Sequence, residues 1–452
     1  MKVINDWMVS CGMKKDIKVL KDPITNKPIQ PVTFADAVYL NNGTRLEDNL
    51  RYLLDKVSVI GNSSKLETSN KNTLVDALNE VVTNKRMYNE YGVMFSGSNP
   101  IGERLGSAED LYAHAYYGSG TRPRNDFDTI YPWSDIKRCI IGDDGTIWSY
   151  EGEPGFTLSP EYGNIFVEIP RFYQKISYDA ERDILELWIS ANPRDGYELS
   201  PAFLNGTNEL PFIYIGAYEL TNDGEKLCSK SGQSVSEESK LTLEEMKDML
   251  KHKSSNFKLI DIHERNILEL LFCIEYATLN SQNIFKGKNI IDSEFGLRTG
   301  ETDFNSEYPS CTLIDSHEHS FRYRYMENLW GNMGEIIDGV IVDNYTVKIM
   351  DKEVYSYSTA DITGSFINER TLEGIPTLSD KQSANNFYFC DYISLPKDGK
   401  QKSYVVGHPH VLNIENQEIS SLGNGLFSVS MDFNIDKADK FVTSRLVYKP
   451  QK

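Results

Sequence analysis

The sequence predicts an α+β fold, in which short antiparallel strands pack beside two helices. Residues 91–211 consist of short apolar and aromatic runs separated by Gly, Pro, Asn and Asp, which is the pattern of strands joined by turns. After residue 240, two segments have the spacing of capped α-helices. With 452 residues, the chain is long enough for about two to four domains and a substantial core.

The charge balance excludes one class of partner. There are 66 acidic and 47 basic residues, which gives a formal net charge of −19. Nucleic-acid binding needs a basic face, and no cluster of Lys and Arg interleaved with aromatics occurs, so we expect no nucleic-acid partner. The six cysteines are scattered without a C-x-x-C pair, which predicts free thiols and assembly in a reducing cytoplasm (Cys11, Cys139, Cys228, Cys273, Cys311, Cys390).

Membrane and secretion signals are not apparent in the sequence. The N-terminal stretch has no apolar core of the kind that a secretory signal needs. The most apolar run, Ile267–Ile274, contains Glu269 and is too short to span a bilayer. We therefore expect a soluble protein without membrane insertion.

The N-terminal part reads as an arm followed by a helical stalk. Residues 1–40 are short strand-like pieces broken by prolines, and Thr44–Glu47 then forms a capping box. The helix that follows has apolar residues at a 3.5-residue spacing, which is typical of a coiled-coil seam (Leu46, Leu50, Leu53, Val57, Ile60). Two heptads are too few to distinguish an oligomer seam from the buried face of a core helix.

Two segments of this part resemble a known family. Residues 37–50 and 70–82 resemble linker and stalk segments of tailed-phage fibre and baseplate proteins, in the sequences AVYLNNGTRLEDNL and NKNTLVDALNEVV. The resemblance implies a homotrimer. It also implies an arm, 1–43, that docks to phage tail or baseplate proteins, and a stalk, 44–90.

The middle of the chain predicts several strands. Asp144-Gly145 marks the turn of a hairpin. The strand at Ile165–Tyr173 contains Pro170, which favours a sheet edge or a bulge. Further strands are expected at Ile184–Ser190 and Phe212–Tyr218.

Two helices follow, each starting at a capping box. Thr242 and Glu245 open a helix that ends near His252, and Asp261 and Glu264 open a second one. The second helix is apolar almost all round, so we expect it to be buried.

The ordered series VEIPRFYQKI, LWISANP, GYELSPAF and FIYIGAYE extends the family resemblance. It resembles phage tail proteins whose distal domain has the C-type-lectin-like fold, which formylglycine-generating enzymes share. The resemblance implies a C-type-lectin-like receptor-binding domain at 161–452 and a β-rich linking region at 91–160. The glycine-rich core loop of that family would be ENLWGNMGEIIDG, at 327–339, and the closing strand Ser444–Tyr448.

The stretch Phe321–Val342 is the organising element of the sequence. Alternation predicts a half-buried strand, with Arg322 and Arg324 on its solvated or ligand-facing side. A glycine-hinged loop around Trp330 follows, and then a second buried strand. A core corner and a scaffold for a binding loop are equally good interpretations, and we expect Trp330 to fill the gap between this loop and the second helix.

Residues 343–424 look like long irregular loops rich in Tyr, Asn, Ser and Gly, which is the composition of adaptable recognition surfaces. The alternative is that the aromatics pack these loops onto the domain. The receptor contacts expected here are Tyr345, Tyr355, Tyr357, Tyr388, His408 and His410.

No catalytic or metal motif stands out. The family's catalytic cysteine pair would lie near the C-terminus, and no cysteine follows Cys390. Glu335 and Asp338 could form a glycosidase pair, but Asp-Gly is equally a turn. His317 with His319, and His408 with His410, lack a third ligand at fixed spacing. We expect no enzymatic activity, no cofactor and no metal.

The sequence as a whole predicts a phage or phage-tail-like receptor-binding protein. It would be located in the virion tail or baseplate, assembled in the host cytoplasm, and would bind a glycan or protein of the bacterial surface. The alternatives are a structural baseplate protein without a receptor and a surface-glycan depolymerase.

Overall fold

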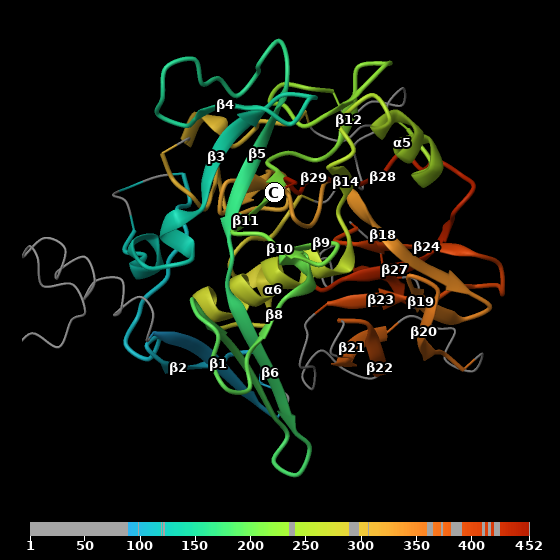
Figure 1. The fold of residues 1–452 in the computed structure, drawn as a ribbon. Coiled ribbons are helices and arrows are strands. Elements are labelled where there is room, and N and C mark those ends of the chain that lie inside the picture. The colour runs from blue at the N-terminus through green and yellow to red at the C-terminus, as the bar shows by residue number, and fades with distance from the viewer. Residues whose placement is uncertain are drawn as a thin grey trace, which may run out of the picture. The chain divides into compact units, whose positions relative to one another are not determined.

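Most of the described chain lies in β-strands and the loops between them, as the computed structural model shows (Figure 1). The structure describes residues 89–97, 99–118, 120, 123–234, 240–288, 298–305, 307–358, 365–371, 374–380, 391–408, 412–414, 417–419 and 425–451. They belong to one compact unit that begins at residue 85. The predicted arm, stalk and seam (Leu46, Leu50, Leu53, Val57, Ile60) lie outside the described residues.

The prediction of an α+β, C-type-lectin-like domain is wrong. Strands dominate the described residues and form several antiparallel sheets, one of which curls into a half-barrel. The described α-helices are α5 at Leu243–Leu250 and α6 at Ile262–Tyr276. Two short helices among so many strands make a mostly β architecture.

A five-stranded sheet has the order β2-β1-β7-β6-β8. Its strands are β1 Glu90–Ser96, β2 Glu103–Gly106, β6 Tyr173–Asp179, β7 Ile184–Ser190 and β8 Glu198–Leu199. The strand predicted at Ile184–Ser190 is confirmed as β7 with the same bounds.

A six-stranded sheet has the order β14-β29-β11-β5-β3-β4. Its strands are β3 Lys137–Ile141, β4 Ile147–Tyr150, β5 Asn164–Pro170, β11 Phe212–Gly216, β14 Phe257–Leu259 and β29 Leu446–Tyr448. The hairpin around Asp144-Gly145 is confirmed, and Gly145 has the positive φ, 88°, that its turn requires. Pro170 is the last residue of β5, a central strand, and pairs with Phe212 beyond the end of the β3 ladder.

The largest sheet has nine strands, in the order β20-β19-β18-β24-β27-β23-β21-β22, with β28 beside β18. They are β18 Gly334–Asp343, β19 Thr346–Ile349, β20 Lys352–Ser356, β21 Ser365–Arg370, β22 Pro376–Asp380, β23 Tyr392–Ser394, β24 Lys402–Val406, β27 Val429–Asn434 and β28 Val442–Thr443. This sheet corrects the prediction of irregular loops at 343–424. Segments such as KEVYS and KSYVV carry β-branched and aromatic residues, which favour strands.

Small sheets and 3₁₀ turns complete the described part. The sheets are β15 Cys311–Thr312, β16 Phe321–Tyr323 and β17 Met326–Glu327; β9 Leu204–Asn205 with β10 Asn208–Glu209; β12 Thr221–Asn222 with β13 Leu227–Cys228; and β25 Leu412–Ile414 with β26 Gln417–Ile419. The turns are η2 Asp126–Thr129, η3 Trp133–Asp135, η4 Pro201–Phe203, η6 Ser281–Asn283 and η7 Asp303–Asn305.

Helix α6 lies among these sheets, near the middle of the unit in Figure 1, and contacts β1, β7 and β18. Both predicted capping boxes, at Thr242 and at Asp261, are confirmed. Ile267, Leu268 and Leu271 of α6 are completely buried, which confirms the expected burial of this helix. Each such side chain stabilises the fold by roughly 1.5–3 kcal/mol relative to exposure.

Candidate functional site

The loop around Trp330 is part of the core. Trp330 is completely buried, and its indole N–H donates to the Phe285 carbonyl oxygen at 3.2 Å. Its ring lies 4.0 Å from that of Phe321 and 5.6 Å from that of Phe272 in α6, measured between centroids. The predicted position of Trp330 between the loop and this helix is confirmed.

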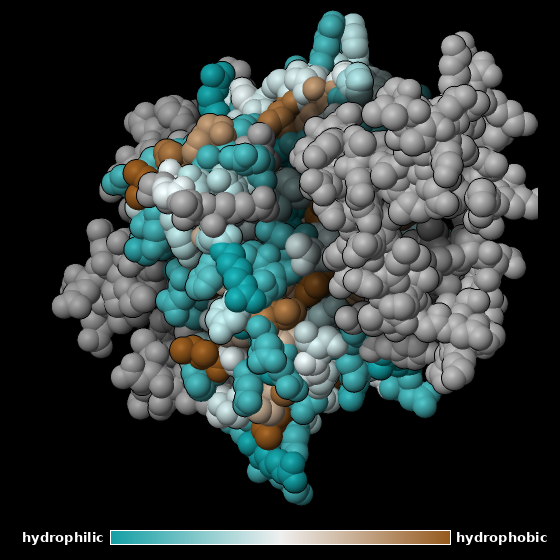
Figure 2. Space-filling view, turned by 90° about the vertical axis from the view of Figure 1, so that its left-hand side faces the viewer, coloured by the Kyte–Doolittle hydropathy of each residue, from teal (hydrophilic) through white to brown (hydrophobic). Residues whose placement is uncertain are grey.

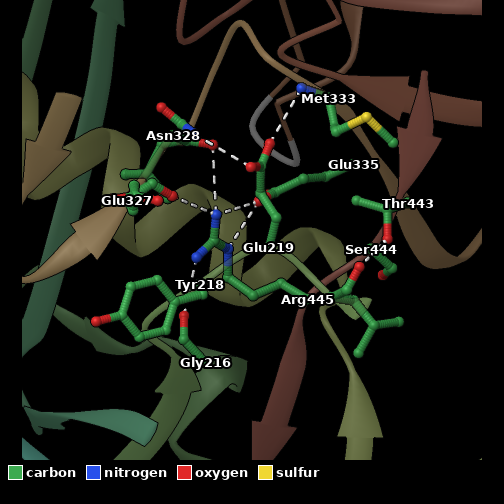
Figure 3. Close-up of polar contacts among 12 residues, drawn as sticks. Gly216, Tyr218, Glu219, Glu327, Asn328, Met333, Glu335, Thr443, Ser444 and Arg445 are labelled. Atoms are coloured by element: carbon green, nitrogen blue, oxygen red, sulfur yellow. Dashed lines mark hydrogen bonds and ion pairs between the residues drawn. The ribbon is translucent and has the colours of Figure 1, made fainter. Parts of the chain in front are cut away.

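The loop that carries Trp330 joins a network of buried charges through its residues Asn328 and Met333 (Figure 3). Arg445 Nε and Nη2 lie 2.7 and 2.6 Å from Glu335 Oε1, and both side chains are at most 1 % exposed. The remaining Arg445 donors bond to the carbonyl oxygens of Gly216 and Glu327, at 2.9 and 2.8 Å. Arg445 thereby links β29, β11, β17 and β18.

Glu219 belongs to the same network. Its carboxylate accepts from Asn332 Nδ2 at 2.5 Å, Asn328 Nδ2 at 3.2 Å and the Met333 backbone amide at 3.0 Å. Burial raises the pKa of Glu219 to about 8, although these hydrogen bonds act in the opposite direction. Because the cluster is sealed and its groups bond to one another, it holds loops together and has no surface for a ligand.

The candidate catalytic pair does not form. Glu335 is bound to Arg445, while Asp338 Oδ1 lies 2.5 Å from Lys247 Nζ. Glu335 also lies 3.7 Å from Arg265 Nη1, so the two carboxylates pair with different cations, and Glu335 is closed to water. The structure does not support the glycosidase interpretation.

The histidines considered as metal ligands have other partners where the structure describes them. His317 Nδ1 lies 3.3 Å from the Gly287 carbonyl oxygen, and His319 Nδ1 lies 3.0 Å from Glu301 Oε1. His408 is buried against Phe433, and His410 lies outside the described residues. Within the described ranges, no three His, Cys, Asp or Glu side chains are grouped to hold a metal ion.

The expected receptor residues occupy different environments. Tyr355 and Tyr357 pack against each other at 4.9 Å, and their hydroxyls donate to the carbonyl oxygens of Thr377 and Pro376. Tyr355 and Tyr357 are half-buried and His408 is buried, so each takes part in packing, and their assignment as receptor contacts stays a prediction. Tyr345 is half-buried at the turn between β18 and β19, and Tyr388 lies outside the described residues.

Arg322 and Arg324 also correct a prediction, because both are buried where a solvated side was expected. Arg324 and Tyr325 have φ of 45° and 68° and form the turn of the β16–β17 hairpin, so the alternation ends at Tyr323. Arg322 donates to the carbonyl oxygens of Thr302, Asn305 and Tyr308. It thereby fixes the segment that carries Tyr308.

Tyr308 forms one wall of an open pocket. The pocket is lined by His114, Tyr116, Pro123, Asn125, Asp128, Tyr308, Pro309 and Ser310. The rings of Tyr116 and Tyr308 are stacked, with centroids 4.0 Å apart and planes 9° apart. Two backbone hydrogen bonds hold these walls together, from Tyr116 N to Ser310 O at 3.3 Å and from Thr312 N to Tyr116 O at 2.9 Å.

Two lining residues of the pocket, Asp128 and Asn125, bond to a buried ion pair between Arg324 and Glu275. Arg324 Nη1 lies 2.8 Å from Asp128 Oδ1, while Nε and Nη2 bond to Glu275 at 2.9 and 2.5 Å. Asn125 Nδ2 donates to Glu275 Oε1 at 2.8 Å. Burial alone would lower the pKa of Arg324, but Glu275 outweighs it and raises the pKa, so the guanidinium stays charged. The side chains of Asp128 and Asn125 are therefore held in place at the pocket by buried charged partners.

Exposed apolar side chains lie close in sequence to the lining residues of this pocket. They are Tyr112 (54 % exposed), Tyr117 (38 %), Phe304 (55 %) and Ile314 (55 %). The Arg124 guanidinium lies 4.5 Å from the centre of the Tyr112 ring. Figure 2 views the molecule from the side of η2 and β2, where hydrophobic residues form small patches between hydrophilic ones. The pocket is shallow, with about 10 Å³ of space, roughly enough for one water molecule, so a ligand would contact its rim and would not be enclosed.

The sequence prediction missed this pocket. A signal was present, because residues 112–120 read YAHAYYGSG, the same Tyr, Gly and Ser composition that directed attention to 343–424. The partner segment at 308–310 is almost 200 residues away in sequence, and nothing local indicates that the two meet.

Comparison with known proteins adds no assignment: no protein-family model matches the chain, and the search of curated proteins gives no significant match.

In the described part, no helix has both the length and the apolar character needed to cross a membrane. The four described cysteines are buried free thiols, as predicted (Cys139, Cys228, Cys273, Cys311).

Proposed function

We propose that this protein is the receptor-binding protein of a tailed phage or phage-tail-like particle, and that the pocket beside the stacked rings of Tyr116 and Tyr308 contacts the bacterial surface. The basis is the contrast between this open, aromatic-walled pocket and the charged clusters suited to chemistry, which are buried and paired. The particle assignment follows from the resemblance of 37–50 and 70–82 to fibre and baseplate segments.

The geometry of the pocket favours recognition over catalysis. Tyr116 and Tyr308 offer rigid apolar area at low entropic cost, because the stacked pair is already ordered. Asp128, Asn125 and His114 add polar groups around them. Hydroxyl-rich ligands such as surface glycans combine apolar ring faces with hydrogen-bonding edges, and this pocket matches both features.

A weak individual pocket suffices if several copies act together. The predicted homotrimer would convert the second and third contacts into intramolecular events, which can raise the overall avidity by roughly 10²–10⁴. The seam at Leu46–Ile60 that would join the copies stays a prediction. Light scattering of the full chain measures it, and a stable monomer at micromolar concentration would contradict it.

Cell binding tests the proposal. Fluorescently labelled full-length protein is titrated onto a panel of bacterial strains, as wild type and as a Tyr116→Ala, Tyr308→Ala double variant. The double variant should bind a receptive strain at least about ten-fold more weakly, because it loses both walls. The matched control is Tyr178→Ala, which removes an exposed tyrosine of β6 and should bind like wild type.

Three outcomes separate the alternatives. Wild-type protein that binds no strain contradicts the proposal and supports a purely structural baseplate role. Unchanged cell binding by the double variant would show that the pocket does not contact the receptor. Shortening of the purified surface glycan during incubation would instead indicate a depolymerase. Thermal unfolding of each variant checks that the fold is retained.

A further inference from the structure

A second exposed aromatic site lies at the end of the six-stranded sheet, around Trp148 in the edge strand β4 (Figure 1). Half of the Trp148 surface is exposed, whereas Trp133 and Trp330 are buried. Single exposed apolar side chains are common on protein surfaces, so exposure alone indicates nothing. The backbone around Trp148 is what distinguishes this residue.

Trp148 is the extra residue of a β-bulge. In the ladder between β3 and β4, Ile140 pairs with Ser149 and Ile141 with Ile147, which leaves Trp148 without an opposite residue. A bulge in an edge strand re-aims a side chain and is common next to functional sites. Here it places two consecutive residues, Ile147 and Trp148, on the exposed surface.

Two glycines form a seat beneath the indole. A Cβ on Gly142 would lie 2.8 Å from Cζ2 of Trp148, and a Cβ on Gly163 would lie 3.2 Å from Cζ3. Gly163 also has a φ of +82°, which other residues rarely adopt. The ring therefore rests on backbone that has no side chain, and its remaining surface is held toward solvent.

A carboxylate lies beside the ring. Asp144 Oδ1 also comes within 2.8 Å of the Cβ position of Gly142, so this oxygen lies next to the indole. Asp144 is exposed and accepts from the amide and the hydroxyl of Thr146, both at 2.9 Å. Hydrogen bonds from Thr146 hold the pKa of Asp144 below its usual value, so it is a carboxylate at neutral pH.

The surroundings select among possible ligands. Three exposed acidic residues lie near Trp148 in sequence, namely Asp144, Glu153 and Glu161. Their negative charges disfavour binding of an anionic polymer. A peptide adding to the β4 edge is disfavoured because the bulge interrupts the ladder, and because the Tyr150 amide already donates to Glu153 Oε2 at 2.8 Å. A flat aromatic face beside a hydrogen-bond acceptor suits a ring with an apolar face and hydroxyl groups.

We propose that Trp148, seated on Gly142 and Gly163 beside Asp144, is a stacking platform for one unit of a neutral saccharide. This site is separate from the Tyr116–Tyr308 pocket and does not depend on the function proposed for it. The pyranose ring would stack on the indole, while a hydroxyl donates to the Asp144 carboxylate.

Calorimetric titration of the full-length chain with three neutral probes, cellotetraose, maltotetraose and chitotetraose, tests this proposal. At least one probe should bind, and Trp148→Ala should weaken that binding at least about ten-fold. Trp148→Phe keeps an aromatic face and should recover most of the affinity. Asp144→Asn should cause a smaller loss, because an amide oxygen still accepts a hydrogen bond.

Two matched variants act as controls. Tyr178→Ala removes another exposed aromatic residue and Tyr308→Ala disrupts the pocket, so both should bind the probe like wild type. The proposal is overturned if none of the three probes binds wild type at concentrations up to about 10 mM. Equal binding by Trp148→Ala, or preferential binding of polygalacturonate through Trp148, would overturn it as well.

Discussion

Arg445 and Arg324 are two buried arginines with similar partners and different surroundings. Each bonds through two nitrogens to a buried glutamate, Glu335 or Glu275. The other donors of Arg445 reach backbone carbonyl oxygens inside the protein, whereas Arg324 extends to Asp128 at the pocket. The two ion pairs therefore differ in what else the arginine binds. Arg445 binds only groups inside the protein and joins strands, whereas Arg324 also binds Asp128, a residue that lines the pocket.

The largest loss of stability is expected from breaking the completely buried ion pair between Arg445 and Glu335. Arg445→Met should lower the free energy of unfolding by about 3–5 kcal/mol, because the buried Glu335 loses both of its hydrogen-bonded contacts and keeps only Arg265 at 3.7 Å. The double variant Arg445→Met, Glu335→Leu should recover much of that loss, since Arg265, the other cation near Glu335, keeps Glu269 as its partner at 3.3 Å. Denaturant unfolding measures both variants, and Arg182→Ala, at an exposed arginine, is the control. A double variant as unstable as the single one would show that the ion pair is not the cause.

Trp330→Ala tests the core next to the same network. The free energy of unfolding should fall by about 3–5 kcal/mol, because the substitution leaves a cavity among Phe321, Phe272 and Gly287. Cell binding per folded molecule should stay unchanged. A variant that melts like wild type and loses binding would make Trp330 a ligand contact.

Buried carboxylates near the sealed cluster predict an unusual pH dependence. Burial raises the pKa of Glu219 to about 8, of Glu327 to about 7 and of Asp391 to about 6. These groups bind protons more tightly in the folded chain than in the unfolded chain, where they titrate near pH 4. Their contribution to stability is therefore fully present below about pH 4 and is lost progressively as the pH rises from there through the raised pKa values of about 6, 7 and 8.

The melting temperature should accordingly fall by roughly 5 °C or more between pH 5.5 and pH 8.5. Scanning calorimetry at constant ionic strength measures this change. Glu219→Gln removes the group with the highest of the three values and should reduce the slope. A melting temperature that rises with pH across this range would contradict the assignment.

Local signals in the sequence predicted local structure correctly. The capping boxes at Thr242 and Asp261, the turn at Asp144-Gly145 and the strand at Ile184–Ser190 each depend on neighbouring residues, and all are present. The strand–loop–strand order around Trp330 is also right, and so is the burial of Trp330.

The long-range pairings were not predictable in the same way. β29 lies between β14 and β11, whose residues are about 200 positions earlier, and β18 pairs with β24 and β28 across long segments. Hydrophobic periodicity gives no partner for such strands, and this is why 343–424 looked irregular. The pocket depends on the same kind of long-range contact, between Tyr116 and Ser310, and was missed for that reason.

Hydrogen–deuterium exchange with and without purified surface glycan from a receptive strain tests the central claim most directly. The account predicts slower exchange in 112–128 and 307–314 when glycan binds, and no change in 327–339, where the sealed network already protects the backbone. Protection confined to 343–358 and 391–408, with none around Tyr116 and Tyr308, would contradict it.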